Sequence, residues 1–121
     1  MLSVNYCNYN FSNPDYDVID RPCGTDDYLF LYFQTPMKIR LNGQTLPVRP
    51  GACILIPPNT PTYYYAVRHF TNSFVHFCGS EAADLVKKYS AIPQNQIFYP
   101  VNINEINSIL KEIYIEATAG A

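Results

Sequence analysis

Tryptophan is absent from this chain of 121 residues, and histidine occurs only twice, as His69 and His76. Metal-dependent catalytic centres in small β proteins need several histidines and a carboxylate, with two histidines at alternate positions of one strand. The two histidines here do not form such a pair, and no spacing of Ser, Cys, His and Asp indicates a nucleophilic centre. We therefore expect no metal, no cofactor and no catalytic residue, and predict that the protein is not an enzyme.

An excess of charge of one sign is also missing. Eight basic side chains stand against ten acidic ones, which gives a formal net charge of −2 and no surplus to neutralise a run of phosphates. No hydrophobic run approaches the length of a membrane span, and the N-terminus lacks the pattern of a secretory signal. We expect a cytoplasmic protein that contacts no membrane and, through these residues, no DNA.

Cysteine is present but not in any arrangement that suggests a metal or redox site. The four residues Cys7, Cys23, Cys53 and Cys78 are widely separated and form no CxxC pair. We expect reduced thiols, most of them buried.

Hydrophobic residues, by contrast, make up 48% of the chain, which is enough for one domain with a sizeable core. From Tyr28 onward they come in short runs separated by turn residues, a rhythm typical of an all-β sandwich or barrel. The pair Asn42-Gly43 predicts a tight hairpin, because both residues tolerate positive φ. Prolines such as Pro47 cannot donate ladder hydrogen bonds, so we expect them at edges and strand ends.

The composition divides the single domain into three parts. Residues 1–27 are rich in Asn, Asp, Pro and Tyr and are expected to form an N-terminal arm and opening segment. Residues 28–79 are expected to form the β-barrel core. The pattern of residues 80–121 predicts a helical tail. It begins with a short helix after Ser80, continues with a brief extended piece, and ends with a longer helix for which Asn102 is a suitable N-cap.

The longer helix carries an apolar stripe of Ile103, Ile106, Leu110 and Ile113 at three- and four-residue spacing. A stripe of this kind must be covered by other apolar surface. Two surfaces are candidates to cover the stripe: the barrel of the same chain, and a second chain in a homodimer. Both contacts can hold together.

The segment RPGACILIPPNTPTYYYAV, residues 49–67, contains two strands separated by an abrupt break. Gly51 permits a tight turn, residues 53–56 form a buried strand, and the prolines that follow make a stiff rim. The tyrosines then restart the ladder, with Thr62 and Tyr64 on one face of the new strand. Such a break suits a barrel in which the chain turns over the mouth of a cavity.

The order of these motifs resembles the N-terminal domain of AraC-type transcription regulators. The resemblance covers about Asp17 to Phe77 and depends on VIDRPCGTDDYLF, on RPG before a four-residue strand and PP, and on FVHF. It implies a cupin-like, jelly-roll β-barrel that holds a small effector, one or two C-terminal helices that form a homodimer, and a separate DNA-binding domain. That domain has no counterpart here, so we interpret the chain as the sensor domain of a longer regulator. The arm, with Tyr6 and Tyr9, is the expected lid.

The resemblance also indicates which side chains bind the effector. Arg21 and Tyr64 match an arginine and a tyrosine that contact the sugar in the arabinose-responsive member of the family. Asn72 replaces a sugar-contacting histidine, Phe74 replaces the tryptophan on which the sugar ring stacks, and His76 replaces a tyrosine. Phe74 and His76 share one face of their strand. We expect these five side chains to bind a carbohydrate or related polar metabolite other than arabinose.

Plainer roles remain open for several of these residues and for the whole chain. Arg21 can pair with Asp17 or Asp20 at the surface, and Tyr64 and His76 can be satisfied core groups. The domain can also be a small cupin enzyme, such as an isomerase or an oxygenase. A third alternative is a scaffold whose barrel is filled by its own aromatic side chains.

Overall fold

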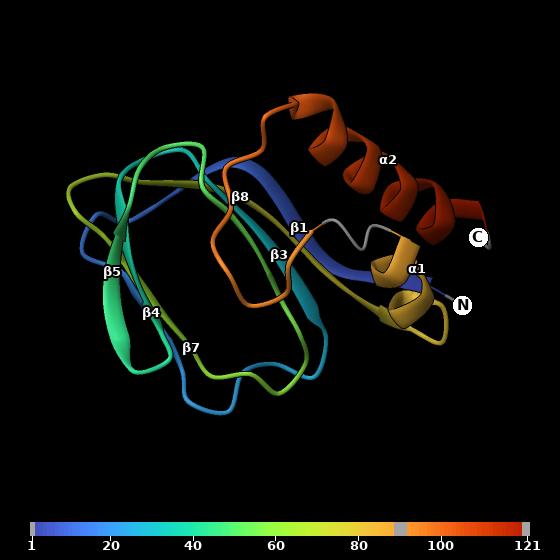
Figure 1. The fold of residues 1–121 in the computed structure, drawn as a ribbon, viewed down its shortest axis with the longest axis horizontal. Helices are drawn as coiled ribbons and strands as arrows, with labels where there is room; N and C mark the ends of the chain where they lie inside the picture. Colours follow the sequence, from blue (N-terminus) through green and yellow to red (C-terminus); the bar gives the residue numbers. More distant parts are fainter. Residues whose placement is uncertain (1, 89–91, 120–121) are drawn as a thin grey trace.

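The computed structural model of this chain describes residues 2–88 and 92–119. Within these residues, two antiparallel four-stranded sheets face each other, and two helices lie against the outer side of one of them (Figure 1). The fold is therefore the mainly β, cupin-like jelly roll with C-terminal helices that the sequence predicts.

The first sheet has the strand order β1-β8-β3-β6, formed by β1 (Leu2–Asn13), β8 (Phe70–Gly79), β3 (Tyr28–Phe33) and β6 (Cys53–Ile56). The second has the order β2-β7-β4-β5, formed by β2 (Val18–Arg21), β7 (Thr62–Ala66), β4 (Met37–Leu41) and β5 (Gln44–Val48). The helices are α1 (Ala82–Lys88) and α2 (Ile103–Ala119).

The first sheet is buried on both faces, and this divides the core into two clusters. Successive side chains on a strand point to opposite faces, so Phe74 packs with the cluster between the sheets while Val75 and Phe77 pack with the cluster under the helices. Sheets covered on both sides have strands that are apolar throughout. The continuous apolar run of β6, CILI, is buried at all four positions for this reason.

The predicted turn chemistry is confirmed. Asn42 and Gly43 have φ values of 52° and 77° and connect β4 to β5. Gly51 has a φ of 96°, which only glycine adopts at low cost. Pro47 lies in β5, an edge strand, where its missing N–H removes no bond from the interior of the sheet.

The N-terminal segment differs from the expected arm. β1 pairs with β8 from Leu2 to Asn13, and β2 pairs with β7, so both strands belong to the sheets and the barrel begins well before Tyr28. The composition of β1 gave no strand pattern because β1 is an edge strand with mostly exposed side chains, Tyr6 and Tyr9 among them. β1 forms a strand because it pairs with the long neighbouring strand β8, and this contact exists only in the folded chain.

Helix α2 begins where the cap was predicted, since the backbone N–H of Asn104 donates to Oδ1 of Asn102 at 2.9 Å. Ile106 and Ile113 are buried in the cluster on the outer side of the first sheet, and Leu110 is partly buried there. The side chain of Ile103 lies outside the described part of the structure. The stripe thus packs on the barrel of its own chain, and dimerisation through it stays a prediction.

The thiols are less buried than expected. Cys53 is fully buried, but Cys7 and Cys23 are exposed and Cys78 is intermediate. Cys7 lies on the solvent-facing edge strand, and Cys23 lies in the turn after β2. The expectation of mostly buried thiols was wrong because it came from residue type rather than from position.

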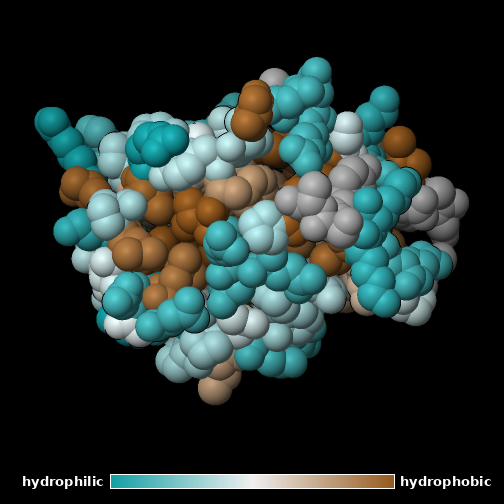
Figure 2. Space-filling view, in the orientation of Figure 1, coloured by the Kyte–Doolittle hydropathy of each residue, from teal (hydrophilic) through white to brown (hydrophobic). Residues whose placement is uncertain are grey.

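The surface on the face seen in Figure 1 is mixed in character. Hydrophobic residues gather between β5 and β8, and hydrophilic residues cover the lower part of the barrel (Figure 2). None of the helices in the described ranges is long and apolar enough to cross a membrane.

Candidate functional site

A cavity of about 150 Å³ lies inside the barrel, where β1 and β8 of one sheet face β2 and β7 of the other. All five predicted ligand residues line it: Arg21, Tyr64, Asn72, Phe74 and His76. These residues come from β2 and from the consecutive strands β7 and β8, which lie much later in the sequence. The structure therefore brings the whole predicted set to one place.

Arg21 reaches the cavity because of alternation along β2. Ile19 and Arg21 face inward, whereas Val18 and Asp20 are exposed. Register places Arg21 opposite Thr62 and Ile19 opposite Tyr64. Within the described residues, Nη1 of Arg21 is buried and has no hydrogen-bond partner. No salt bridge joins Arg21 to Asp17 or Asp20 in the described part of the chain.

Tyr64 lines the cavity and belongs to the core as well. It is 4% exposed, and its ring centroid lies 5.3 Å from that of Phe33 and 6.0 Å from that of Phe70. Burial raises the pKa of Tyr64 to about 12, although the nearby charge of Arg21 acts in the opposite direction. The phenol therefore stays neutral and keeps a hydroxyl that can both donate and accept.

The strand β8 contributes three alternate side chains to the same wall. Nδ2 of Asn72 donates to Oδ1 of Asn13 at 3.1 Å, which fixes the amide. The ring of Phe74 lies 5.3 Å from that of Tyr6 and 5.9 Å from that of His76, measured between centroids. The wall thus combines an oriented amide with a group of three aromatic rings.

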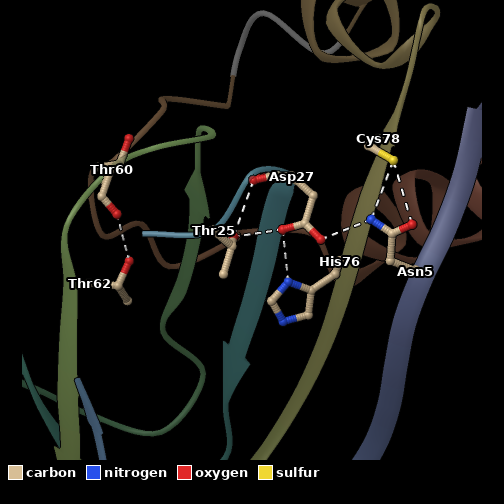
Figure 3. A network of polar contacts seen from close by, with 7 residues as sticks. All are labelled: Asn5, Thr25, Asp27, Thr60, Thr62, His76 and Cys78. Carbon is tan, nitrogen blue, oxygen red and sulfur yellow. Dashed lines mark hydrogen bonds and ion pairs between the residues drawn. The ribbon is translucent and has the colours of Figure 1, made fainter. Parts of the chain in front are cut away.

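His76 is held by a buried carboxylate behind the cavity (Figure 3). Its Nδ1 lies 3.1 Å from Oδ1 of Asp27, and the two residues are 8% and 6% exposed. Asp27 also accepts hydrogen bonds from Thr25 at 2.6 Å and from Asn5 at 3.0 Å. Asn5 in turn contacts the thiol of Cys78. His76 is therefore a hydrogen-bonded core residue that also lines the cavity, so its position fits both interpretations of the sequence, a core group and a candidate ligand contact.

The electrostatics of Asp27 follow from these contacts. Burial alone would raise the pKa of its carboxyl. The hydrogen bonds from Thr25, Asn5 and His76, together with the charge of His76, outweigh burial and lower the pKa below its ordinary value. The carboxylate form is thus the one that the fold stabilises.

Five further residues complete the lining and were not predicted as ligand contacts: Tyr6, Phe11, Asn13, Ile19 and Phe70. The alternation of side chains along a strand could have identified Ile19 as a lining residue, because it stands two positions before Arg21 and so shares its face. The β1 residues were missed because β1 was not predicted as a strand, although Tyr6 was named for the lid. Asp27 was missed because its neighbour His76 is 49 positions away.

A larger hollow of about 530 Å³ lies elsewhere, beside the β4–β5 hairpin. Asp20, Arg40 and Tyr63 are among its lining residues. The guanidinium carbon of Arg40 lies 4.2 Å from the centre of the Tyr63 ring, so its charge already has an aromatic partner. The interior cavity is the stronger candidate because it holds the predicted residues and an unpartnered buried donor.

The described residues contain no group of three or more His, Cys, Asp or Glu side chains placed to hold a metal ion. His76 and Asp27 form a pair, and the other residues near them are Thr25, Asn5 and the Cys78 thiol. We therefore assign no metal ligand in this site.

Comparison with known proteins gives distant structural likenesses and a family match. No curated protein sequence matches the chain significantly. A structure of the Streptomyces albus enzyme HEPD, with 2-hydroxyethylphosphonate and Fe(II) bound, is similar over 68% of this chain at 20% identity and a TM-score of 0.43. The chain spans only 20% of that protein, and at this level the likeness carries no functional argument.

The family comparison covers most of the barrel and the helical tail. The AraC-like ligand binding domain matches residues 24–120, which include Tyr64, Asn72, Phe74 and His76 and begin just after Arg21. With more than half of the chain matched, this protein belongs to the AraC-like ligand-binding domain family.

Proposed function

We propose that this chain is the effector-sensing domain of an AraC-family transcription regulator, and that its cavity binds a small polar, carbohydrate-like metabolite. The observation that carries the proposal is the convergence of the five predicted side chains on one cavity, where a buried donor of Arg21 is unpartnered. Apolar walls with a few converging polar groups are typical of small-molecule sites. We assign ligand binding, and no catalytic step, to these residues.

The size of the cavity constrains the ligand. Its volume of about 150 Å³ equals that of an engineered cavity that takes a benzene ring, and it is below the roughly 300–1,000 Å³ of drug-sized pockets. A monosaccharide has twice as many heavy atoms as benzene and needs the wall to move outward. The wall formed by β1 is suited to this, because β1 is an edge strand whose pairing with β8 is interrupted twice.

Such an outward movement of β1 would couple ligand binding to the rest of the regulator. A ligand that contacts Tyr6 and Phe11 stabilises one position of β1 over another. Only a difference in affinity between the two positions produces a switch. The lid function expected for the N-terminal arm is thus assigned to β1, as a wall of the barrel.

We further propose that the regulator is a cytoplasmic homodimer and that a separate domain contacts DNA. The net charge of −2 supports assigning DNA contact elsewhere. Because Ile106 and Ile113 are buried within their own chain, a dimer that forms through α2 must use the remaining faces of this helix. Light scattering on this domain should give twice its mass of 13.8 kDa. A single-chain mass would contradict dimerisation by this segment.

A scaffold is the second candidate, and the small volume of the cavity favours it. The rings of Tyr64, Phe70 and Phe74 occupy the barrel interior beside the cavity. On this hypothesis the domain binds no effector, and its folded barrel only presents surfaces to partner chains. It predicts that no small molecule stabilises the domain.

A thermal-shift screen separates the two candidates. Neutral sugars, polyols, sugar acids and divalent metals are tested against the purified domain, and a ligand at a hundredfold excess over its Kd should add about 2.7 kcal/mol. Ile19→Phe places a bulkier, aromatic side chain in the cavity and should abolish the thermal shift caused by the ligand. Val18→Phe is the matched control, because Val18 is 47% exposed on the outward face of β2.

Two results would count against the sensor. A ligand whose effect survives Ile19→Phe binds outside the cavity. The absence of any stabilising compound in a broad screen favours the scaffold.

A further inference from the structure

The charges around the cavity indicate the class of ligand, an inference that depends on the proposed function. Arg21 is the permanently charged residue among the described lining residues, and none of them is Asp or Glu. The cavity therefore offers one positive charge and no fixed negative charge of its own.

The nearest carboxylates are engaged by other groups. Oδ2 of Asp17 accepts a hydrogen bond from the amide of Asn13 at 3.0 Å. Asp27 accepts from Thr25 and Asn5 and faces His76. Nη1 of Arg21 remains buried without a hydrogen-bond partner in the described residues. Arg21 also interacts with the hydroxyl of Tyr64, but a buried donor atom without a partner is unfavourable, and a ligand oxygen that bears negative charge would satisfy it.

The remaining lining specifies the rest of the ligand. The hydroxyl of Tyr64 offers a neutral hydrogen bond, whereas Phe74 and Ile19 offer apolar contact. One guanidinium matches one negative charge, and the described lining contains no second Lys or Arg for a phosphate dianion. With β1 in its present position, the cavity of about 150 Å³ favours a short ligand over a full monosaccharide.

We infer that the effector is a short hydroxy carboxylic acid, whose carboxylate binds the Nη1 donor of Arg21 and whose hydroxylated chain lies along Tyr64 and Phe74. This assigns the ligand to the sugar acids rather than to the neutral sugars.

The test compares two compounds that differ only at the acid group. Threonate is a four-carbon sugar acid, and threitol is the four-carbon polyol with an alcohol in place of the carboxylate. Binding of each is measured by isothermal titration calorimetry to the wild type and to Arg21→Gln, which keeps a polar side chain but removes the charge. Arg68→Gln changes the net charge equally at an exposed position and is the matched control.

We expect threonate to bind the wild type and Arg68→Gln alike, and to lose about ten- to a hundredfold in affinity in Arg21→Gln. Threitol should bind weakly and equally to all three proteins. Without ligand, Arg21→Gln should unfold in one cooperative thermal transition, as the wild type does. That result also shows that the variant folds.

Three outcomes overturn the inference. These are equal binding of threitol and threonate to the wild type, threonate binding that survives Arg21→Gln, and binding of neither compound. The sensor function is judged separately. A neutral sugar that stabilises the wild type but not Ile19→Phe supports a sensor while excluding an acid ligand.

Discussion

At the scale of single residues, the two sides of the cavity treat buried polar atoms differently. His76 and Asp27 are hydrogen-bonded to each other, and the Asp27 carboxylate also accepts hydrogen bonds from Thr25 and Asn5. Across the cavity, Nη1 of Arg21 is buried without a partner among the described residues. Unsatisfied buried donors are rare in native proteins and mark sites where something else binds. The satisfied side supports the fold, and the unsatisfied side is where we propose that the ligand binds.

The first prediction concerns the pH dependence of Asp27. Because its pKa is lowered in the folded state, the carboxylate stabilises the fold above its unfolded pKa of about 3.9, and this contribution is lost as the pH falls through the folded pKa. Asp27→Asn should lower the free energy of unfolding at pH 7 by roughly 1–2 kcal/mol. The difference from wild type should shrink below about pH 4.

Urea denaturation of both proteins from pH 7 to pH 3 measures this difference. Asp26→Asn is the control, because Asp26 is exposed beside the buried residue. A difference that stays constant over the whole range would show that the effect of Asp27→Asn is not due to its ionisation.

At the scale of elements, β8 connects the cavity to the helices. Phe74 and His76 project to the cavity side of the strand, and Val75 and Phe77 project to the cluster that α1 and α2 cover. A displacement of β8 or of its partner β1 therefore changes both clusters together. Loops that connect the two sheets also contact one another.

One such contact is the approach of the β2–β3 loop to the β6–β7 loop, and it gives the second prediction. A Cβ added at Gly24, where φ is 67°, would lie 2.3 Å from the carbonyl oxygen of Thr60. Gly43 has a φ of 77°, and a Cβ there would meet nothing within 4 Å. Gly43→Ala should cost about 1–2 kcal/mol from backbone strain alone, and Gly24→Ala at least about 1 kcal/mol more from the clash.

Chemical denaturation of the two variants gives both values. Equal losses of stability would show that the loop relaxes away from Thr60 and that only the backbone conformation matters.

At the scale of the whole molecule, the two clusters share the first sheet, so the barrel and the helical tail form one packed unit. Cys53 marks this shared centre. It is fully buried, pairs with Tyr32 of β3, and exchanges backbone hydrogen bonds with Phe98 before α2. Access to its thiol requires that the chain between α1 and α2 separates from the sheet.

The third prediction uses this thiol as a reporter of global opening. Burial raises the pKa of Cys53 from 9.0 to about 12, which leaves on the order of a thousandfold fewer thiolates at pH 8. In a variant with Cys7, Cys23 and Cys78 replaced by serine, a thiol reagent should modify Cys53 only at the rate of unfolding. Urea should restore fast labelling.

The matched variant that retains Cys7 instead should react at once, because Cys7 is exposed. Prompt labelling of Cys53 in the folded protein would show that the tail opens without the barrel and that the two do not form one unit.

Local patterns in the sequence account for a large part of this fold. Asn42-Gly43 and Gly51 predict their turns because positive φ depends on the residue itself, and Asn102 predicts the start of α2 for a similarly local reason. Alternation on one strand predicts that Phe74 and His76 share a face. The family resemblance adds Arg21 and Tyr64, which period-2 counting alone does not single out.

The strand β1 and the Asp27 partner of His76 have no comparable local pattern. β1 is polar and aromatic, and it is a strand because β8 offers it a long edge. Asp27 looks like an ordinary loop acid until the fold places it against a residue 49 positions away. The exposed positions of Cys7 and Cys23 likewise depend on where the chain runs and not on the residue type.

The sequence by itself determined the barrel class, its turns, the cap of the last helix and five of the ten side chains that meet in the cavity. These features depend on residues close together in the chain, or on a motif order shared by a family. The tertiary structure alone decided that β1 is a wall of the cavity and that Ile106 and Ile113 pack on their own barrel. It also decided that, among the described residues, Nη1 of Arg21 has no hydrogen-bond partner whereas His76 has one. Pairing, burial and the satisfaction of a buried charge are decided between segments that meet only when the whole chain has folded.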